Sequence, residues 1–275
     1  MTIIDSATSR PEPYLTFTST MDVTMKSVLL ATLMALSIGA AAVAAAPSLP
    51  AYVSAAVADK GRDADRDVDA RRHPAEVIAF SGVKSGDKVV DLIPGSGYFT
   101  KIFSKIVGPK GHVFMIWPNA YAKEAQPDPV KNADLARTGY PNTSVILQPG
   151  AAFATPEPVD LVFTVQNYHD YPDKFMGKID PMVFNRAVFK ALKPGGVFLI
   201  VDHTGEAGSG MRDTDTLHRI DPAIVKQQVT DAGFVFEGES LVLRNPADDL
   251  KKVVFDKAIR GHTDQFIYKF RKPKK

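Results

Sequence analysis

Three of the six histidines in this sequence stand beside or near carboxylates, and they are the side chains best suited to acid–base chemistry. His169 precedes Asp170, His203 follows Asp202, and His218 ends the run MRDTDTLH. An imidazole with an ordinary pKa of about 6.5 can accept a proton at neutral pH. Histidines with nearby acids also resemble a metal-ligand set, but separations of 34 and 15 residues match no compact ligand spacing. We therefore expect proton transfer and no metal site.

A glycine turn within KVVDLIPGSGYFT, residues 88–100, is the second feature that could do chemistry. The backbone amides of Gly95 and Gly97 can approach a ligand closely, because glycine has no side chain to hold it away. Asp91 precedes the turn, where it either organises a cofactor loop or simply caps a turn or helix. Ile93 and Pro94 stand where a first glycine would be expected. The residues alone leave open whether the turn still holds a cofactor.

The elements that must position these residues alternate between strand and helix. Apolar β-branched runs predict strands, and apolar spacing of 3.6 residues with proline starts and glycine ends predicts helices. The predicted strands cover residues 88–93, 111–117, 143–148, 159–165, 197–203, 234–243 and 264–272, and the predicted helices cover 74–80, 97–108, the second half of 173–196, and 221–233.

This order of elements predicts a doubly wound α/β fold with a parallel sheet and helices on both faces. No helix separates the last two strands, which therefore form an antiparallel hairpin at one edge. In such sheets ligands bind at the carboxyl ends of the strands, where the strand order reverses. We expect the glycine turn, the run QNYHDY after the fourth strand, and Asp202-His203 at the fifth to share one cleft.

Five segments, in order, resemble motifs of class I S-adenosylmethionine-dependent methyltransferases: VVDLIPGSGYFT, GHVFMIW, VDLVFTVQNYHDY, LKPGGVFLIVDH and AGFVFEGESLVL. More narrowly, IPGSGYFT, NYHD, LHRID, RNPADD and RGHTDQFIYKFRKP are similar to a group of bacterial predicted methyltransferases, several of them exported. The resemblance covers about residues 72–273. It implies the Rossmann-like, seven-stranded class I methyltransferase fold, S-adenosylmethionine as cofactor, and a small-molecule acceptor of unknown identity. The rival interpretation is a protein that keeps this fold and binds another ligand or partner without methyl transfer.

The resemblance also assigns roles to single residues. Cofactor contacts fall on Asp91, Gly95, Ser96, Gly97, Tyr98, Trp117 and Asn167. His169 stands where the acceptor binds, so with Asp170 it would take the acceptor's proton, and His203 and His218 are the other catalytic candidates. Each histidine has a structural alternative: His169 as a hydrogen-bond partner in a turn, and His218 as a surface or helix-packing residue.

The sequence departs from the family where two polar anchors are expected. Family members usually end the second strand in an acid that binds both ribose hydroxyls, and Trp117 stands there. An Asp often follows the third strand, and the matching run is PGAAF. At about 1 kcal/mol per hydrogen bond, these losses predict a roughly tenfold to several hundredfold weaker affinity. Asn119 or Gln148 could compensate, and Trp117 and Tyr98 could present ring faces to the sulfonium.

Composition excludes several classes of protein. The 33 basic and 31 acidic side chains leave a net charge of only +2, so no charge footprint for nucleic acid is present. The absence of cysteine excludes disulfides, thiolate metal sites and a cysteine nucleophile. The composition is that of an ordinary globular protein, and the small-molecule partner is an expectation that comes from the resemblance alone. It leaves the oligomeric state open.

The amino end predicts export. Residues 25–46 have the order of a secretory signal, with a lysine, an apolar run and small exit residues. An uncleaved anchor at 27–46 is the alternative, and would be the only membrane contact. Residues 1–24 form a polar extension, and we expect translation to start at Met21 or Met25. Residues 47–72, in which five acids and five bases fall between 59 and 72, read as a solvated linker. Residues 73–275 form the methyltransferase-like domain of a periplasmic protein.

Overall fold

The structure is a computed structural model that describes residues 49–274. The extension and the signal segment predicted for residues 1–46 lie outside the described residues. Between residues 49 and 274, no helix has both the length and the apolar character needed to cross a membrane.

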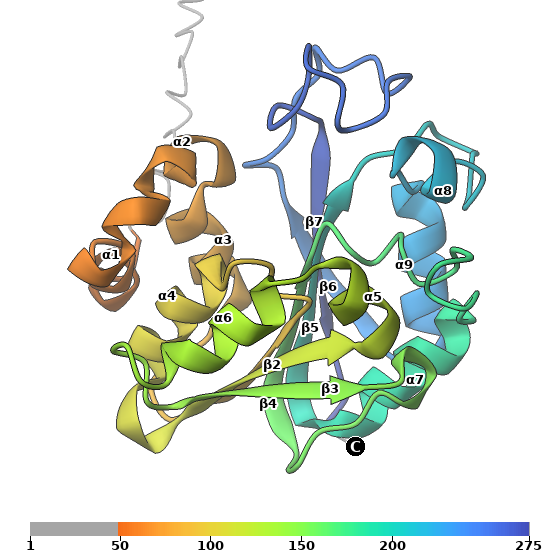
Figure 1. Cartoon of the computed structure of the whole chain (residues 1–275). Coiled ribbons are helices and arrows are strands. Elements are labelled where there is room, and N and C mark those ends of the chain that lie inside the picture. Colours follow the sequence, from red (N-terminus) through yellow and green to blue (C-terminus); the bar gives the residue numbers. More distant parts are fainter. Residues whose placement is uncertain (1–48, 275) are drawn as a thin grey trace, which may run out of the picture. The chain divides into compact units, whose positions relative to one another are not determined.

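Seven strands of the described chain form one sheet (Figure 1): β1 (Lys88–Leu92), β2 (His112–Pro118), β3 (Thr143–Gln148), β4 (Val159–Val165), β5 (Leu192–His203), β6 (Val235–Ser240) and β7 (Gln265–Arg271). Their order is β3-β2-β1-β4-β5-β7-β6. Strands β1 to β5 are parallel, and β7 runs antiparallel between β5 and β6. The predicted parallel sheet with an antiparallel edge hairpin is therefore confirmed, and the order reverses between β1 and β4.

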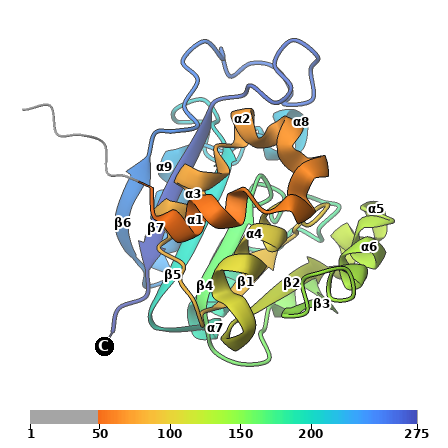
Figure 2. The same cartoon turned by 90° about the vertical axis from the view of Figure 1, so that its left-hand side faces the viewer.

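Helices cover both faces of the sheet, as Figure 2 shows from a second side. The α-helices are α1 (Ala51–Val57), α2 (Asp69–Arg72), α3 (Pro74–Ser81), α4 (Tyr98–Val107), α5 (Asn119–Glu124), α6 (Asp128–Leu135), α7 (Pro181–Ala191), α8 (Thr214–Leu217) and α9 (Pro222–Asp231). The 3-10 turns are η1 (Lys60–Val68), η2 (Gly108–Lys110) and η3 (Gly150–Ala152).

Two apolar cores separate the sheet from its helices, because successive strand side chains point to opposite faces. Val89 and its neighbours on one face pack with α1, α3 and α4. Val90 and Leu92 point to the other face, which α7 and α9 cover. On α7, Phe184 and Val188 are buried, but Val183, which helical spacing places with them, is 49% exposed.

The fifth strand begins earlier than the sequence predicts. Leu192 pairs with Val159, and after a shift in register Val197 pairs with Leu161. The run LKPGG, residues 192–196, therefore belongs to β5 and contains its irregular start, whereas the sequence predicts a turn that precedes the strand.

Residues 51–72 are helical, where the sequence predicts a solvated linker. Val53 and Ala56 of α1 are buried in the core that contains α3 and α4. The charges of this segment are paired: the fully buried Arg62 donates to Asp69 at 2.8 Å, and other acids bind lysines of α4, as in Lys101 Nζ–Asp65 at 2.8 Å. Ion pairs and a short apolar helix, invisible in the composition, hold the segment on the domain.

Candidate functional site

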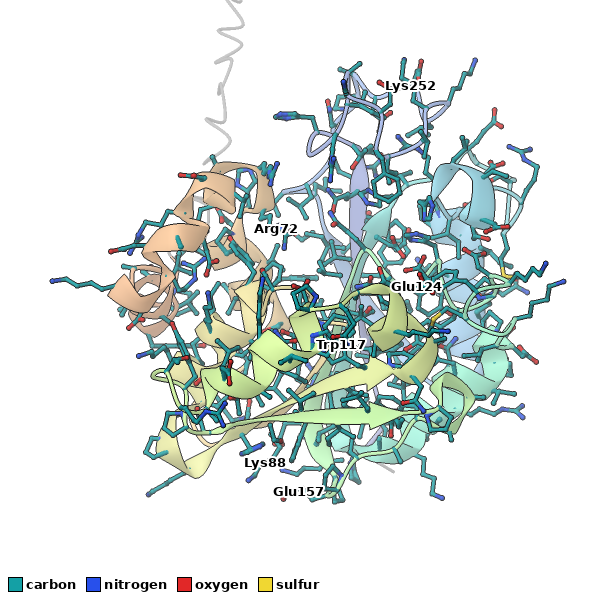
Figure 3. All side chains as sticks on the ribbon, in the orientation of Figure 1. Arg72, Lys88, Trp117, Glu124, Glu157 and Lys252 are labelled. Atoms are coloured by element: carbon teal, nitrogen blue, oxygen red, sulfur yellow. The ribbon has the colours of Figure 1, made fainter. Side chains whose placement is uncertain are left out.

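The principal cavity lies at the carboxyl ends of β1, β2, β4 and β5, around the point where the strand order reverses. Its volume is about 660 Å³. Figure 3 labels Arg72, Trp117 and Glu124 of its wall, which come from α2, β2 and α5. The remaining wall consists of Ile93, Pro94, Gly95, Ser96, Tyr121, Ala125, Asp128, Val165, Gln166, Asn167, His169, Asp170, Phe175, His203, His218, Val254 and Phe255.

The glycine turn after β1 forms one side of this cavity. Ile93 has φ 54°, so it adopts a left-handed backbone that favours glycine, and Gly95 follows with φ 55°. A β-branched residue in this region is a strained outlier, and Pro94 disfavours the conformation further. Ile93 is 4% exposed and belongs to the core, and its carbonyl oxygen accepts a hydrogen bond from the Asn167 side chain. The turn therefore holds left-handed positions at Ile93 and Gly95, the first of them a buried isoleucine.

Asp91 lies behind the turn and outside the cavity wall. It is 2% exposed, and its carboxyl accepts from the Thr100 hydroxyl at 2.5 Å. Burial raises the pKa of Asp91 to about 7, although hydrogen bonds from the Thr100 hydroxyl and backbone oppose the rise. The residue therefore links β1 to the first turn of α4.

Gly97 and Tyr98 also lie outside the cavity wall. A Cβ on Gly97 would come 2.8 Å from Leu135 Cδ1, so its glycine serves the contact with α6. The Tyr98 hydroxyl bonds to Asp69, and the guanidiniums of Arg62 and Arg72 stand 4.9 and 4.8 Å from its ring centroid. The Tyr98 ring already faces these cations, which does not support the expected sulfonium contact.

His169 is the centre of a buried polar cluster on the opposite side of the cavity. Its Nδ1 lies 2.8 Å from Asp202 Oδ1, and its backbone N–H donates to Asp202 Oδ2 at 2.9 Å. Its Nε2 lies 3.3 Å from Asp170 Oδ1 and 3.3 Å from His218 Nδ1. The fold thus joins His169, Asp170 and His218, three of the residues that the sequence singled out. Their sequence separations, the basis for expecting no metal site, are no obstacle to a shared site.

The charges around His169 determine its protonation. Burial alone would lower the pKa of the imidazole, but the charge and hydrogen bond of Asp202, together with Asp170, raise it to about 9. The pKa of Asp202 lies below its ordinary value, because the neighbouring histidine and backbone N–H outweigh the effect of burial. With a pKa of about 9, His169 favours the cationic form at neutral pH, which differs from the ordinary imidazole assumed from sequence.

His203 lines the cavity but does not join that cluster. Its Nδ1 lies 2.7 Å from the Thr263 hydroxyl, and its ring centroid is 6.2 Å from that of His169. Burial lowers the pKa of His203 to about 3 despite the opposing charge of Asp202, so this side chain is neutral.

His218 is held by the residue that follows it. It caps α8 with φ 53°, and the adjacent Arg219 is fully buried. Arg219 donates to the Thr204 and Lys252 carbonyls and pairs with Asp248 at 2.9 Å. These bonds fasten the segment 241–264, which rises beside α2 and α8 at the top of Figures 1 and 2. The exposed Phe255 of that segment packs its ring 4.8 Å from the His218 ring.

Comparison with known proteins identifies the architecture. No protein-family model matches the chain. It is 26% identical over 186 residues to the ubiquinone/menaquinone biosynthesis C-methyltransferase UbiE of Pasteurella multocida, which covers 65% of this chain and 64% of that protein. The chain therefore spans less than two thirds of that relative's length.

Two solved structures share the fold. One is the N-methyltransferase NodS from Bradyrhizobium japonicum WM9 in complex with S-adenosyl-L-homocysteine, with a TM-score of 0.52 and 15% identity over 80% of this chain and 96% of that one. The chain has the class I methyltransferase fold. The [4+2]-cyclase SpnF is also similar, with a TM-score of 0.55 and 17% identity over 78% and 85% of the two chains. The chain is thus similar in sequence to a C-methyltransferase and similar in fold to class I methyltransferases.

In this class I methyltransferase fold, Trp117 is the last residue but one of β2, and its side chain is fully buried at the cavity wall. Its Nε1 donates to Asn132 Oδ1 at 3.0 Å, and Asn132 Nδ2 donates to the Gly95 carbonyl at 3.1 Å. Asn132 of α6 therefore links Trp117 of β2 to the glycine turn. Asn119 and Gln148, the expected substitutes for the missing acid, do not line the cavity.

Two acids and one base at the cavity wall were missed from sequence. Glu124 ends α5 and Asp128 begins α6, so both follow β2 closely enough to stand near the position of the missing acid. Arg72 ends α2, and among residues 49–274 it has no ion-pair or hydrogen-bond partner. Burial lowers the pKa of Arg72, but a guanidinium stays charged. The family resemblance begins at about Arg72, and nothing else in the sequence indicated that this residue belongs to the site.

Proposed function

We propose that this protein transfers a methyl group from S-adenosylmethionine to an acceptor that remains to be identified, a small molecule by our expectation. The observation that carries the proposal is the cavity at the strand-order reversal, which is walled by a glycine turn with left-handed backbone at Ile93 and Gly95. The similarity to a NodS structure that holds S-adenosyl-L-homocysteine supports the choice of cofactor.

Three charged residues suit the parts of this cofactor. The partly buried guanidinium of Arg72 is a partner for the methionine carboxylate, because a buried cation gains most from an anion that accepts its hydrogen bonds. Glu124 and Asp128 are acceptors for the ribose hydroxyls in place of the acid that Trp117 replaces. Asn167 and Ser96 complete the wall beside the turn.

The acceptor binds on the side of His169, Asp170 and His218. Methyl transfer needs the acceptor held in line with the sulfonium methyl, and positioning alone accounts for a large part of the rate. Since an imidazolium has no lone pair for a further proton, the proposal does not depend on His169 as a base.

The decisive experiment is calorimetry of the full chain with S-adenosylmethionine and S-adenosylhomocysteine. Gly95→Val is the test variant, since a Cβ there meets nothing within 4 Å and its side chain enters the cavity wall. Gly86→Val is the matched control, because Gly86 also has positive φ and open space but precedes β1, away from the cavity. We expect at least a tenfold loss, about 1.4 kcal/mol, for Gly95→Val and a change within about twofold for the control.

The rival function is a binding protein or a different enzyme on the same fold. It is favoured by Trp117, whose only polar hydrogen is already bound to Asn132. The likeness to the cyclase SpnF agrees with the rule that one fold serves several activities. Absence of binding by both cofactor forms in the wild-type chain would decide for this rival.

A further inference from the structure

Three ligand-type atoms converge at one side of the cavity. His169 Nε2 lies 3.3 Å from Asp170 Oδ1 and 3.3 Å from His218 Nδ1, and the last two atoms are 3.8 Å apart. All three residues line the cavity, and the first two are almost completely buried. Two imidazoles and one carboxylate therefore form a triangle with one face toward the cavity.

The size of this triangle fits a metal ion. Metal–nitrogen bonds of about 2.0–2.1 Å at tetrahedral angles place two ligand atoms about 3.3–3.4 Å apart. The two 3.3 Å separations match this value. The third separation, 3.8 Å between Asp170 Oδ1 and His218 Nδ1, is slightly longer, and a small rotation of the partly exposed His218 side chain would shorten it to the same value. Two histidines and one carboxylate on one face leave further positions open for other ligands.

Asp202 orients the central ligand. Its carboxylate accepts from His169 Nδ1 at 2.8 Å and is itself fixed by the backbone N–H groups of His169 and His203. Because Nδ1 is directed at this carboxylate, Nε2 is the nitrogen presented to Asp170 and His218. A carboxylate behind a histidine is the usual support of a metal-binding imidazole, since it sets the tautomer and the ring orientation.

The backbone supports the third ligand in the same way. His218 has a left-handed backbone, φ 53°, at the end of α8, and contacts of the neighbouring residue hold it there. Those contacts are the buried bonds of Arg219 to Thr204, Lys252 and Asp248. Strained residues of this kind occur often at ligand sites.

We propose that His169, Asp170 and His218 bind one divalent first-row transition-metal ion through Nε2, Oδ1 and Nδ1, with Asp202 as the positioning residue and the open coordination positions facing the cavity. Imidazole donors favour zinc, iron, cobalt or nickel over magnesium, which takes oxygen ligands. Such an ion would lower the pKa of a coordinated hydroxyl or water at the acceptor side of the cavity. The site stands independently of cofactor binding, because none of its ligands belongs to the glycine turn.

The test uses the full chain without a histidine tag, stripped with a chelator, and titrated with Zn²⁺ by calorimetry and with Co²⁺ by visible absorption. We expect one equivalent bound with micromolar or tighter affinity, and a Co²⁺ spectrum of low coordination number. His218→Ala and Asp170→Asn should each weaken binding at least about 100-fold. Asp202→Asn should keep the stoichiometry and weaken binding by about 10–100-fold, the range for a supporting partner. His262→Ala, which removes an exposed histidine outside this cavity, is the control and should bind normally.

Circular dichroism and thermal melting of each variant separate lost folding from lost ligands, and His218 is the most exposed of the three ligands, with 28% of its side chain accessible. Folded His218→Ala that binds Zn²⁺ as the wild type does would overturn the proposal. So would wild-type binding weaker than millimolar, or stoichiometry that falls equally in His262→Ala. All titrations are done without S-adenosylmethionine, so failure of the cofactor proposal leaves this result interpretable.

Discussion

Replacing Asp91 by asparagine should remove a pH-dependent loss of stability. Burial raises the pKa of this carboxyl from 3.8 to about 7, so the folded state holds the proton more tightly than the unfolded state. For such a group the native state is favoured at low pH, and stability falls as the pH rises from the unfolded toward the folded pKa. Asparagine keeps the shape and an oxygen for Thr100 but cannot ionise.

The magnitude follows from the two pKa values. The full shift of about 3 units corresponds to about 4 kcal/mol of unfolding free energy. With proton binding to both states included, about 2.5 kcal/mol of this loss falls between pH 5 and pH 8. Other titrating groups contribute equally to wild type and variant, so they cancel in the difference between the two proteins.

The assay is urea unfolding of wild type and Asp91→Asn at both pH values, without added ligands. We expect the wild type to lose about 2.5 kcal/mol more than the variant on going from pH 5 to pH 8. Any effect of lost hydrogen bonds on the variant is the same at each pH and does not enter this double difference. A double difference below about 1 kcal/mol, or one of opposite sign, would show that the carboxyl is not held neutral by burial.

Three further predictions concern the loop, the cofactor and export. Gly97→Ala should lower the unfolding free energy by about 1–3 kcal/mol more than Gly208→Ala. Both glycines have φ 80°, but only a Cβ at position 97 would contact α6. Chemical denaturation of the two variants measures this difference, and equal losses would contradict the prediction. Arg72→Met should weaken S-adenosylmethionine binding roughly 10- to 100-fold, because a hydrogen bond to a charged group contributes about 1.5–3 kcal/mol. The control variant Arg71→Met, at the neighbouring position, should bind as the wild type does. Calorimetry that finds the same affinity for both variants would show that Arg72 does not belong to the cofactor site. Mass spectrometry of the native protein should find a new amino terminus between residues 46 and 51, because α1 belongs to the core; an intact Met1 or Met25 terminus in a soluble cytoplasmic fraction would refute export.

The sheet and the cavity could be predicted because their signals are local. Runs of β-branched residues between glycine turns predict the strands. A glycine turn after the first strand indicates that the ligand site lies at the carboxyl ends of the strands, where the strand order reverses. Gly95, Trp117 and Asn167, which were predicted as cofactor contacts, line the cavity, and their contact with a cofactor stays a prediction. Tyr98 does not line it, because its contacts with Arg62 and Asp69 come from a segment whose packing depends on distant partners.

The remaining features depend on contacts between distant residues. The charged run at residues 59–72 is predicted to be solvated, because the sequence does not show that Lys101 of α4 forms an ion pair with Asp65. The metal-type triangle could not be derived from spacing, because 49 positions separate His169 from His218 and only the sheet and the Arg219 bonds join them. Glu124 lies in a helix whose sequence gives no sign that it faces a cavity.

The isoleucine in the glycine turn has a consequence for how this sequence can evolve. A return to glycine at Ile93 would relieve about 1–2 kcal/mol of left-handed backbone strain. It would also delete a buried side chain of the core, a change that costs about 2–5 kcal/mol for a large-to-small substitution. The second effect is the larger, so glycine is expected to be the less stable choice at position 93. A glycine there would require a neighbouring side chain to enlarge and fill the space, so the packing beneath the turn restricts which residue can stand in it.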